Sequence, residues 1–243
     1  MSTDRTPRRE DYFARSKKPL HILFFLAPLI VAYEIGAAVF LASDTSAITQ
    51  DIRAHRLLAD FFEAFGVGGF YLPGVALTVV LLLWHVLARH QWKVLPGTLV
   101  GMLLESAMWT LPLIVLAQFV VAAPASAAAV ALAESGGSLH DLPLAARATI
   151  ALGAGLYEEL LFRLVAITLV HLLLADVIRM PSRWADILAV VAAAAAFGVY
   201  HDDHANLAFY FIAGVYFGGL FIARGFGIAV ATHAVYDLVA LLL

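Results

Sequence analysis

Two adjacent carboxylates and an arginine lie inside a long apolar stretch of this 243-residue chain: Glu158, Glu159 and Arg163. Each charged side chain near the centre of a bilayer costs about 2.5–3.5 kcal/mol on insertion scales. Three such groups so close together are therefore expected to serve a function. A carboxylate in apolar surroundings can act as a general base that takes a proton from water or from a substrate.

Helical geometry predicts different roles for the two glutamates. Glu159 and Arg163 are four residues apart with the acid first, which is the favourable order for an ion pair on one helix face. Glu158 points about 100° away from Glu159. We expect Arg163 to neutralise Glu159, which leaves Glu158 as the reactive carboxylate. The alternative is an inert charge cluster that holds helices together.

Two histidines extend this set of polar groups. His201 follows Phe197 by four residues at the end of an alanine-rich run, and His233 precedes Asp237 by four residues in the last apolar stretch. A histidine and an acid at this spacing share one helix face. Ionisable groups inside a membrane are commonly functional, so we expect this pair to take part in the chemistry.

Composition places these motifs in a membrane protein. Hydrophobic residues make up 63% of the chain and charged residues 14%, against about 25% charged residues in soluble domains. Cysteine is absent, which excludes disulfides, a thiolate nucleophile and a Cys-ligated metal. Long apolar runs predict an all-α, polytopic transmembrane helical bundle of about seven spans, with eight as the alternative. The seven are expected at 20–42, 70–88, 97–121, 146–175, 185–201, 205–223 and 225–243.

The distribution of Lys and Arg predicts the orientation of the bundle. With a cytoplasmic N-terminus, eleven of these residues fall in inner segments and three in outer segments, which agrees with the positive-inside rule. The stretch 43–69 predicts an amphipathic surface helix, and 122–140 predicts an outer loop. Gly214 and Gly218 are expected to let neighbouring helices approach closely.

The three motifs together carry a resemblance to a known family. Glu158-Glu159-x-x-x-Arg163, Phe197-x-x-x-His201 and His233-x-x-x-Asp237, in this order, resemble the motifs of the CPBP family. Its members are CAAX-processing and bacteriocin-processing intramembrane endopeptidases, also called the ABI family. The resemblance divides the single membrane domain into a basic cytoplasmic tail, N-terminal transmembrane helices with their loops, and a CPBP-like catalytic core, at 1–19, 20–145 and 146–243.

The resemblance implies hydrolysis of a peptide bond by a glutamate-dependent mechanism. Glu158 and His201 would hold and activate a water molecule, and the Glu159 ion pair would organise the site. His233 and Asp237 would stabilise the oxyanion of the tetrahedral intermediate. Position 237 is often Asn in the family, and an ionised Asp cannot donate a hydrogen bond. Asp237 would therefore be protonated or would orient His233.

Cofactors, partners and location follow from the same resemblance. No cofactor is expected, and a divalent metal at Glu158, His201 and His233 is the less favoured alternative. The expected partners are a membrane-anchored protein or peptide substrate and the lipid bilayer of a prokaryotic cytoplasmic (inner) membrane, with no nucleic acid. The sequence does not define an oligomeric state.

Two other functions remain alternatives, and the expected depths of the site residues in the membrane do not agree. A proton-coupled transporter would use Glu34 and Glu105 in its pathway, and an inactive binding protein could share the fold. Counting residues along the spans puts Glu158 and His233 near mid-membrane but His201 near the outer end of its span. A tilted helix, a different span boundary or a water-filled cavity that opens outward would reconcile these depths, and we favour the cavity.

Overall fold

The computed structural model of the chain describes residues 11–41, 53–69, 71–120 and 142–242. Every regular element in these ranges is helical, which confirms the predicted all-α fold. The elements are α1 (Tyr12–Ser16), α2 (Pro19–Gly36), η1 (Ala37–Leu41), α3 (Arg53–Ala64), α4 (Leu72–Leu87), α5 (Pro96–Val120), α7 (Leu144–Glu159), η3 (Leu160–Ile167), α8 (Thr168–His171), η4 (Leu172–Val177), α9 (Ser182–Tyr200), α10 (Leu207–Arg224) and α11 (Phe226–Leu242).

Apolar helices occupy all seven predicted spans within the described ranges. Five are long and apolar enough to cross a membrane, and α4 and α11 are apolar but shorter. The chain is therefore a multi-pass helical membrane protein. The five long helices are Pro19–Leu41, Pro96–Val120, Leu144–Val177, Ser182–Tyr200 and Leu207–Arg224. The predicted outer loop at 122–140 and the first ten residues of the basic tail lie outside the described residues.

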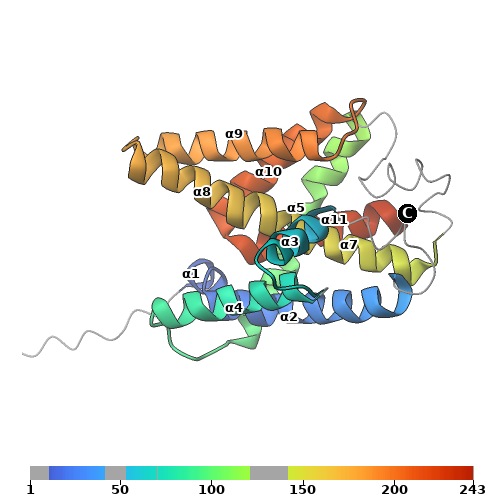
Figure 1. Cartoon of the computed structure of the whole chain (residues 1–243), viewed down its shortest axis with the longest axis horizontal. Coiled ribbons are helices and arrows are strands. Elements are labelled where there is room, and N and C mark those ends of the chain that lie inside the picture. The colour runs from blue at the N-terminus through green and yellow to red at the C-terminus, as the bar shows by residue number, and fades with distance from the viewer. Residues whose placement is uncertain (1–10, 42–52, 70, 121–141, 243) are drawn as a thin grey trace, which may run out of the picture.

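One long helix forms the centre of the arrangement. It runs without a break from α7 through η3, α8 and η4, and α11 packs along its α7 part. The turn at Gly225, whose φ is +87°, reverses the chain between α10 and α11. α9 packs against α10 on one side of the molecule, and α2 and α4 lie on the other (Figure 1).

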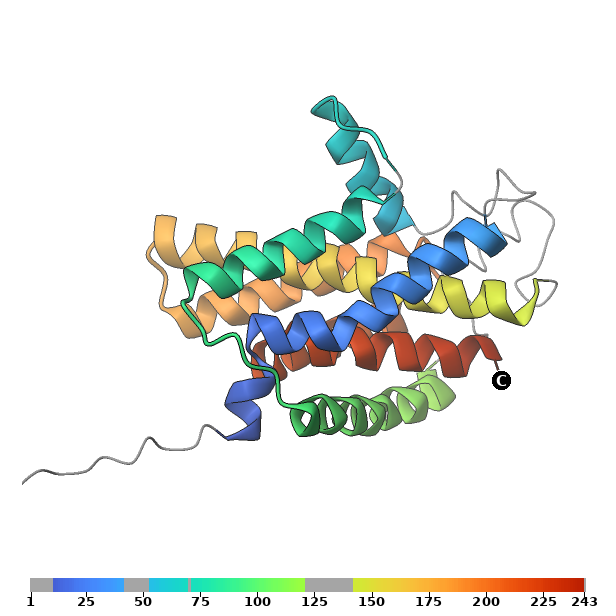
Figure 2. The same ribbon diagram turned by 90° about the horizontal axis from the view of Figure 1, so that it is seen from below.

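The predicted surface helix is present as α3, while residues 43–52 of that stretch lie outside the described residues. Figure 2 shows α3 rising from the bundle beside the start of α4. Its first turn is anchored, because Ala54 and His55 are buried. Leu57 and Phe61 farther along the helix are exposed, as expected for an amphipathic helix at a membrane surface.

Small residues bring the helices of the site into close contact. A Cβ atom added at Gly155 of α7 would lie 2.7 Å from the backbone nitrogen of Ala234 in α11. One added at Gly214 of α10 would lie 2.8 Å from the Cα atom of Ala194 in α9. The expected role of Gly214 in helix packing is thus confirmed, and Gly155 plays the same role between the two helices that carry the acidic and histidine motifs.

Gly155→Ala should therefore lower the melting temperature of the purified protein. The added methyl group would meet the backbone of Ala234 rather than a flexible side chain, so α7 and α11 must move apart. Overpacking of this kind costs about 1–3 kcal/mol. Gly219→Ala is the matched control, because an added Cβ there meets nothing within 4 Å. Equal melting temperatures for the two variants in the same detergent would contradict this account of the interface.

Candidate active site

Glu158 and Glu159 are the last residues of α7, at the point where the helix changes its winding. The following segment, η3, is π-helical, and such segments are rare and frequent at functional sites. Arg163 lies one turn farther on, with its Nη1 atom 3.0 Å from Oε1 of Glu159. The sequence predicted this ion pair correctly, but it gave no signal for the π-helical winding.

Two aromatic rings contact Arg163 in addition to its ion-pair partner Glu159. Its guanidinium carbon lies 4.4 Å from the ring centroid of Phe197 and 5.1 Å from that of Phe217. The side chain is only 1% exposed. Cation–π contacts are strongest when the cation is desolvated, so the two rings partly replace the water that this charge has lost.

His233 of α11 joins the two glutamates in a way that the sequence did not predict. Its Nδ1 atom is 2.7 Å from Oε1 of Glu159, the same oxygen that faces Arg163. Its Nε2 atom is 3.9 Å from Oε2 of Glu158 and 3.5 Å from Oδ2 of Asp237. Glu159 therefore fixes both the arginine and the imidazole, and Nδ1 of His233 carries the hydrogen of that contact because an ionised carboxylate only accepts.

His201 approaches Glu158 from the C-terminal end of α9. Its Nδ1 atom lies 2.8 Å from the carbonyl oxygen of Phe197, four residues earlier. A carbonyl only accepts hydrogen bonds, so Nδ1 carries the hydrogen and Nε2 of a neutral ring is free to accept. Nε2 lies 3.8 Å from Oε2 of Glu158, and the ring stacks on Tyr210 with centroids 3.9 Å apart. The separation in depth that the sequence suggested is thus wrong, because the two side chains meet.

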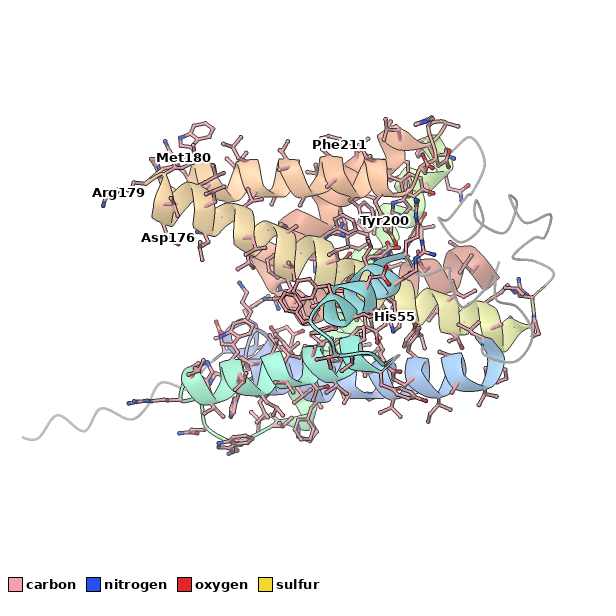
Figure 3. All side chains as sticks on the ribbon, in the orientation of Figure 1. His55, Asp176, Arg179, Met180, Tyr200 and Phe211 are labelled. Atoms are coloured by element: carbon pink, nitrogen blue, oxygen red, sulfur yellow. The ribbon has the colours of Figure 1, made fainter. Side chains whose placement is uncertain are left out.

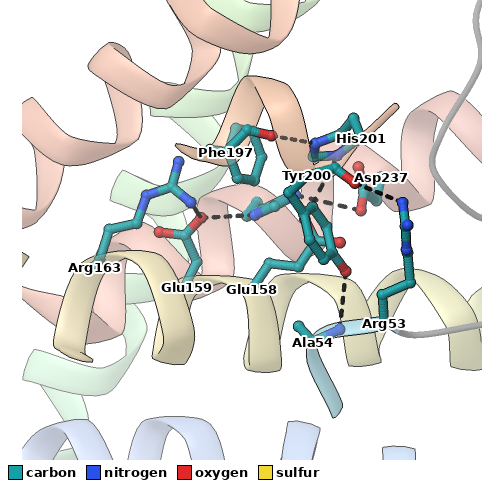
Figure 4. A network of polar contacts seen from close by, with 10 residues as sticks. Arg53, Ala54, Glu158, Glu159, Arg163, Phe197, Tyr200, His201 and Asp237 are labelled. Carbon is teal, nitrogen blue, oxygen red and sulfur yellow. Dashed lines mark hydrogen bonds and ion pairs between the residues drawn. The ribbon is translucent and has the colours of Figure 1, made fainter. Parts of the chain in front are cut away.

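The result is a buried cluster in which two imidazole Nε2 atoms approach one carboxylate oxygen of Glu158 (Figure 4). Glu158, His201 and His233 are each at most 5% exposed. Their separations of 3.8 and 3.9 Å exceed a direct hydrogen bond, so a water molecule can bridge these groups. The arrangement can hold a small polar group between a base and two further nitrogen atoms.

Two other intramembrane glutamates lie outside this cluster. Glu34 of α2 accepts a 2.9 Å hydrogen bond from the hydroxyl of Tyr157. Glu105 of α5 accepts hydrogen bonds from Arg224 and Tyr12. Both contacts join different helices, which is the ordinary structural role of a buried acid. In the described part of the chain, no group of three His, Asp or Glu side chains is placed to hold a metal ion.

The sequence reasoning missed the contribution of α3 and of Tyr200. Arg53 Nη1 donates a 2.8 Å hydrogen bond to the carbonyl oxygen of Tyr200, and the amide of Ala54 donates a 2.9 Å bond to its hydroxyl. Figure 3 labels Tyr200 near the middle of the molecule, far from Arg179 at the other end of the α8–α9 pair. The only sequence signal was that Tyr200 directly precedes His201.

One of the comparisons with known proteins finds a similar family. Residues 140–239 match the family model described as type II CAAX prenyl endopeptidase Rce1-like. The match contains all three motifs and every residue from Glu158 to Asp237. Neither the curated proteins nor the solved structures gave a match. The family match supports the resemblance that the motifs carry, because residues 140–239 of this chain are similar to a family of CAAX-type membrane proteases.

Proposed function

We propose that this protein is an intramembrane endopeptidase that hydrolyses a peptide bond near the membrane anchor of a protein or peptide. The observation that carries the proposal is the convergence of two imidazole Nε2 atoms on one buried oxygen of Glu158, at 3.8 and 3.9 Å. That spacing accommodates a water molecule between a base and its partners. The family match over residues 140–239 supports a protease.

Glu158 and His201 hold the attacking water in this mechanism. Each can accept one of its two hydrogen atoms, since Nδ1 of His201 is occupied by the carbonyl of Phe197. Glu158 takes one proton as the water oxygen attacks the carbonyl carbon of the substrate, and general-base catalysis contributes about 10²–10⁴ in rate. The protonated acid then delivers this proton to the nitrogen of the breaking peptide bond.

His233 stabilises the oxyanion that forms on the former carbonyl oxygen. Since Nδ1 donates to Glu159, Nε2 can donate only if the ring is the imidazolium. Glu159 and Asp237 both lie against this ring and favour its positive charge. Removal of one oxyanion donor commonly costs about 10²–10³ in rate, and that is the expected loss for His233→Ala.

Asp237→Asn should keep most of the activity. The side chain stays isosteric, and the amide that replaces the carboxylate can itself donate a hydrogen bond. Leucine cannot form a hydrogen bond, so Asp237→Leu should lower the cleavage rate about 10²-fold. The initial rates of the two variants on one substrate decide the matter. A loss in Asp237→Asn as large as that in Asp237→Leu would mean that the negative charge is required.

The proposed water activation uses no metal, so a chelator should not reduce activity. After dialysis of the detergent-solubilised protein against EDTA, we expect an unchanged cleavage rate and no gain on addition of Zn²⁺ or Mg²⁺. A loss that Zn²⁺ restores would favour the metal alternative at Glu158, His201 and His233.

The proposal includes a place for the protein in the cell. We propose a prokaryotic cytoplasmic membrane, a cytoplasmic N-terminus and an active site open to the outer face. The chain contains no cysteine, so single cysteines at 158 and 201 can be labelled without removing others. Labelling by an impermeant external thiol reagent is expected in intact cells, and protection of both positions would refute an outward opening.

The test of the function is a comparison of membrane-protein termini in cells that express wild type or Glu158→Gln at equal levels. A defined set of termini that is lost in the variant would establish proteolysis and identify the substrate. Unchanged termini would refute the proposal. If the variant then still showed a phenotype, the proton-coupled transporter would be favoured, whereas a Glu158→Gln protein that keeps its full function would fit a binding protein.

A further inference from the structure

We propose that one face of α10 sets the ring planes of the two site imidazoles. Tyr210 is the positioning residue for His201, and Phe217 has the same role for the second histidine, His233. The inference rests on the proposed hydrolytic function, because both histidines act in that reaction. Tyr210 and Phe217 are seven residues apart in α10, so their side chains lie on one helix face. α10 packs against α9, which ends next to His201, and against α11, which carries His233.

The ring of His201 is restrained at one nitrogen and on one face. Its Nδ1 atom donates a 2.8 Å hydrogen bond to the carbonyl oxygen of Phe197 (Figure 4). The terminal torsion of a histidine has broad energy wells, so this single bond leaves the ring plane loosely defined. The Tyr210 ring stacks on the imidazole with centroids 3.9 Å and planes 18° apart. The stack therefore fixes the plane and keeps Nε2 toward Oε2 of Glu158, at 3.8 Å.

His233 is restrained in the same way, two turns farther along α10. Its Nδ1 atom donates to Glu159 at 2.7 Å, and the Phe217 ring stacks on the imidazole with centroids 4.6 Å and planes 21° apart. The face of an aromatic ring carries negative charge density and attracts a cation. Phe217 therefore fixes the plane of His233 and also favours the imidazolium form that the oxyanion step requires.

Close packing of α10 holds the two rings in place. Tyr210 is 6% exposed and Phe217 is 2% exposed. Gly214 lies between them on the same face, where an added Cβ atom would meet the Cα atom of Ala194 at 2.8 Å, so α10 sits directly against α9. Side chains packed to this density keep one rotamer. The two rings are thus rigid enough to orient the imidazoles.

The first test compares Tyr210→Leu with Tyr210→Phe. Leucine removes the stacked ring, whereas phenylalanine keeps the ring and removes only the hydroxyl. The substrate is a membrane-anchored reporter that carries the cleavage sequence identified from the lost termini. We expect Tyr210→Leu to lower kcat about 10-fold with KM unchanged, and Tyr210→Phe to keep the wild-type kcat. A wild-type kcat in Tyr210→Leu, or equal losses in both variants, would overturn the role of the ring.

Phe217→Leu has a matched control in Phe226→Leu. Both changes remove a buried ring, since Phe217 is 2% and Phe226 1% exposed. Phe226 belongs to a different hydrophobic cluster, which it forms with α2 residues such as Ile22. Both variants should melt at a lower temperature than wild type, but only Phe217→Leu should lower kcat about 10-fold when both are assayed while folded. Equal kcat values would make Phe217 a packing residue and refute its positioning role.

A double variant shows through which residue Tyr210 acts. His201→Gln keeps a hydrogen-bond acceptor for the water but has no ring to stack. Tyr210→Leu should then cost no further activity when it is added to His201→Gln, because residues that act through one contact are not additive. A further loss of about 10-fold would mean that Tyr210 acts elsewhere, and the proposal would fail. If Glu158→Gln still cleaves the reporter, it is the proposed function that fails.

Discussion

Glu158→Gln should reduce the cleavage rate about 10³-fold while the protein stays folded in the membrane. Glutamine keeps the size of the side chain, but its amide cannot take a proton from water. The loss then equals the contribution of a general base, about 10²–10⁴ in rate. The rate is measured on a membrane-anchored reporter that carries the cleavage sequence identified from the lost termini, with the wild type and the variant at equal concentration in the same detergent.

A second buried glutamate provides the control for this result. Glu34→Gln makes the same chemical change in α2, where the hydroxyl of Tyr157 can still donate to the remaining amide oxygen. We expect this variant to keep its activity. Equal losses in both variants would show that any intramembrane carboxylate is required, which is the behaviour of a proton pathway rather than of one base. An active Glu158→Gln would exclude Glu158 as that base.

Removal of Arg163 should have the largest effect on stability. The side chain is the partner of Glu159, and the two groups are 1% and 0% exposed. Breaking a buried ion pair from one side leaves an uncompensated charge and costs about 3–5 kcal/mol. Arg163→Met also gives up the contacts of the guanidinium with Phe197 and Phe217. The measurement is thermal unfolding in detergent, where the variant should melt well below wild type.

A double variant separates the charge from the packing. Arg163→Met with Glu159→Gln contains no unpaired charge in this pair, so its melting temperature should recover toward that of wild type. Its activity should not recover, because His233 then lacks the carboxylate that holds its Nδ1 atom at 2.7 Å. A melting temperature as low as in Arg163→Met alone would contradict this explanation and assign the loss to packing.

The sequence determined the features that depend on local geometry and on composition. Hydropathy predicted seven apolar helices because a span needs only length and apolar side chains, and the structure has them. The ion pair between Glu159 and Arg163 was predictable because residues four apart on a helix are neighbours in any fold. The order of the three motifs was enough to indicate the family.

Only the tertiary structure decided how these motifs meet. His201 joins Glu158 although residue counting put them at different depths, because a count along one helix does not include how two helices lie relative to each other. The contact between His233 and Glu159 depends on the close packing of α7 on α11, which Gly155 permits. Tyr200 and Arg53 lie 147 residues apart. Pairings over such distances are set by the packing of the whole bundle, and no local pattern encodes them.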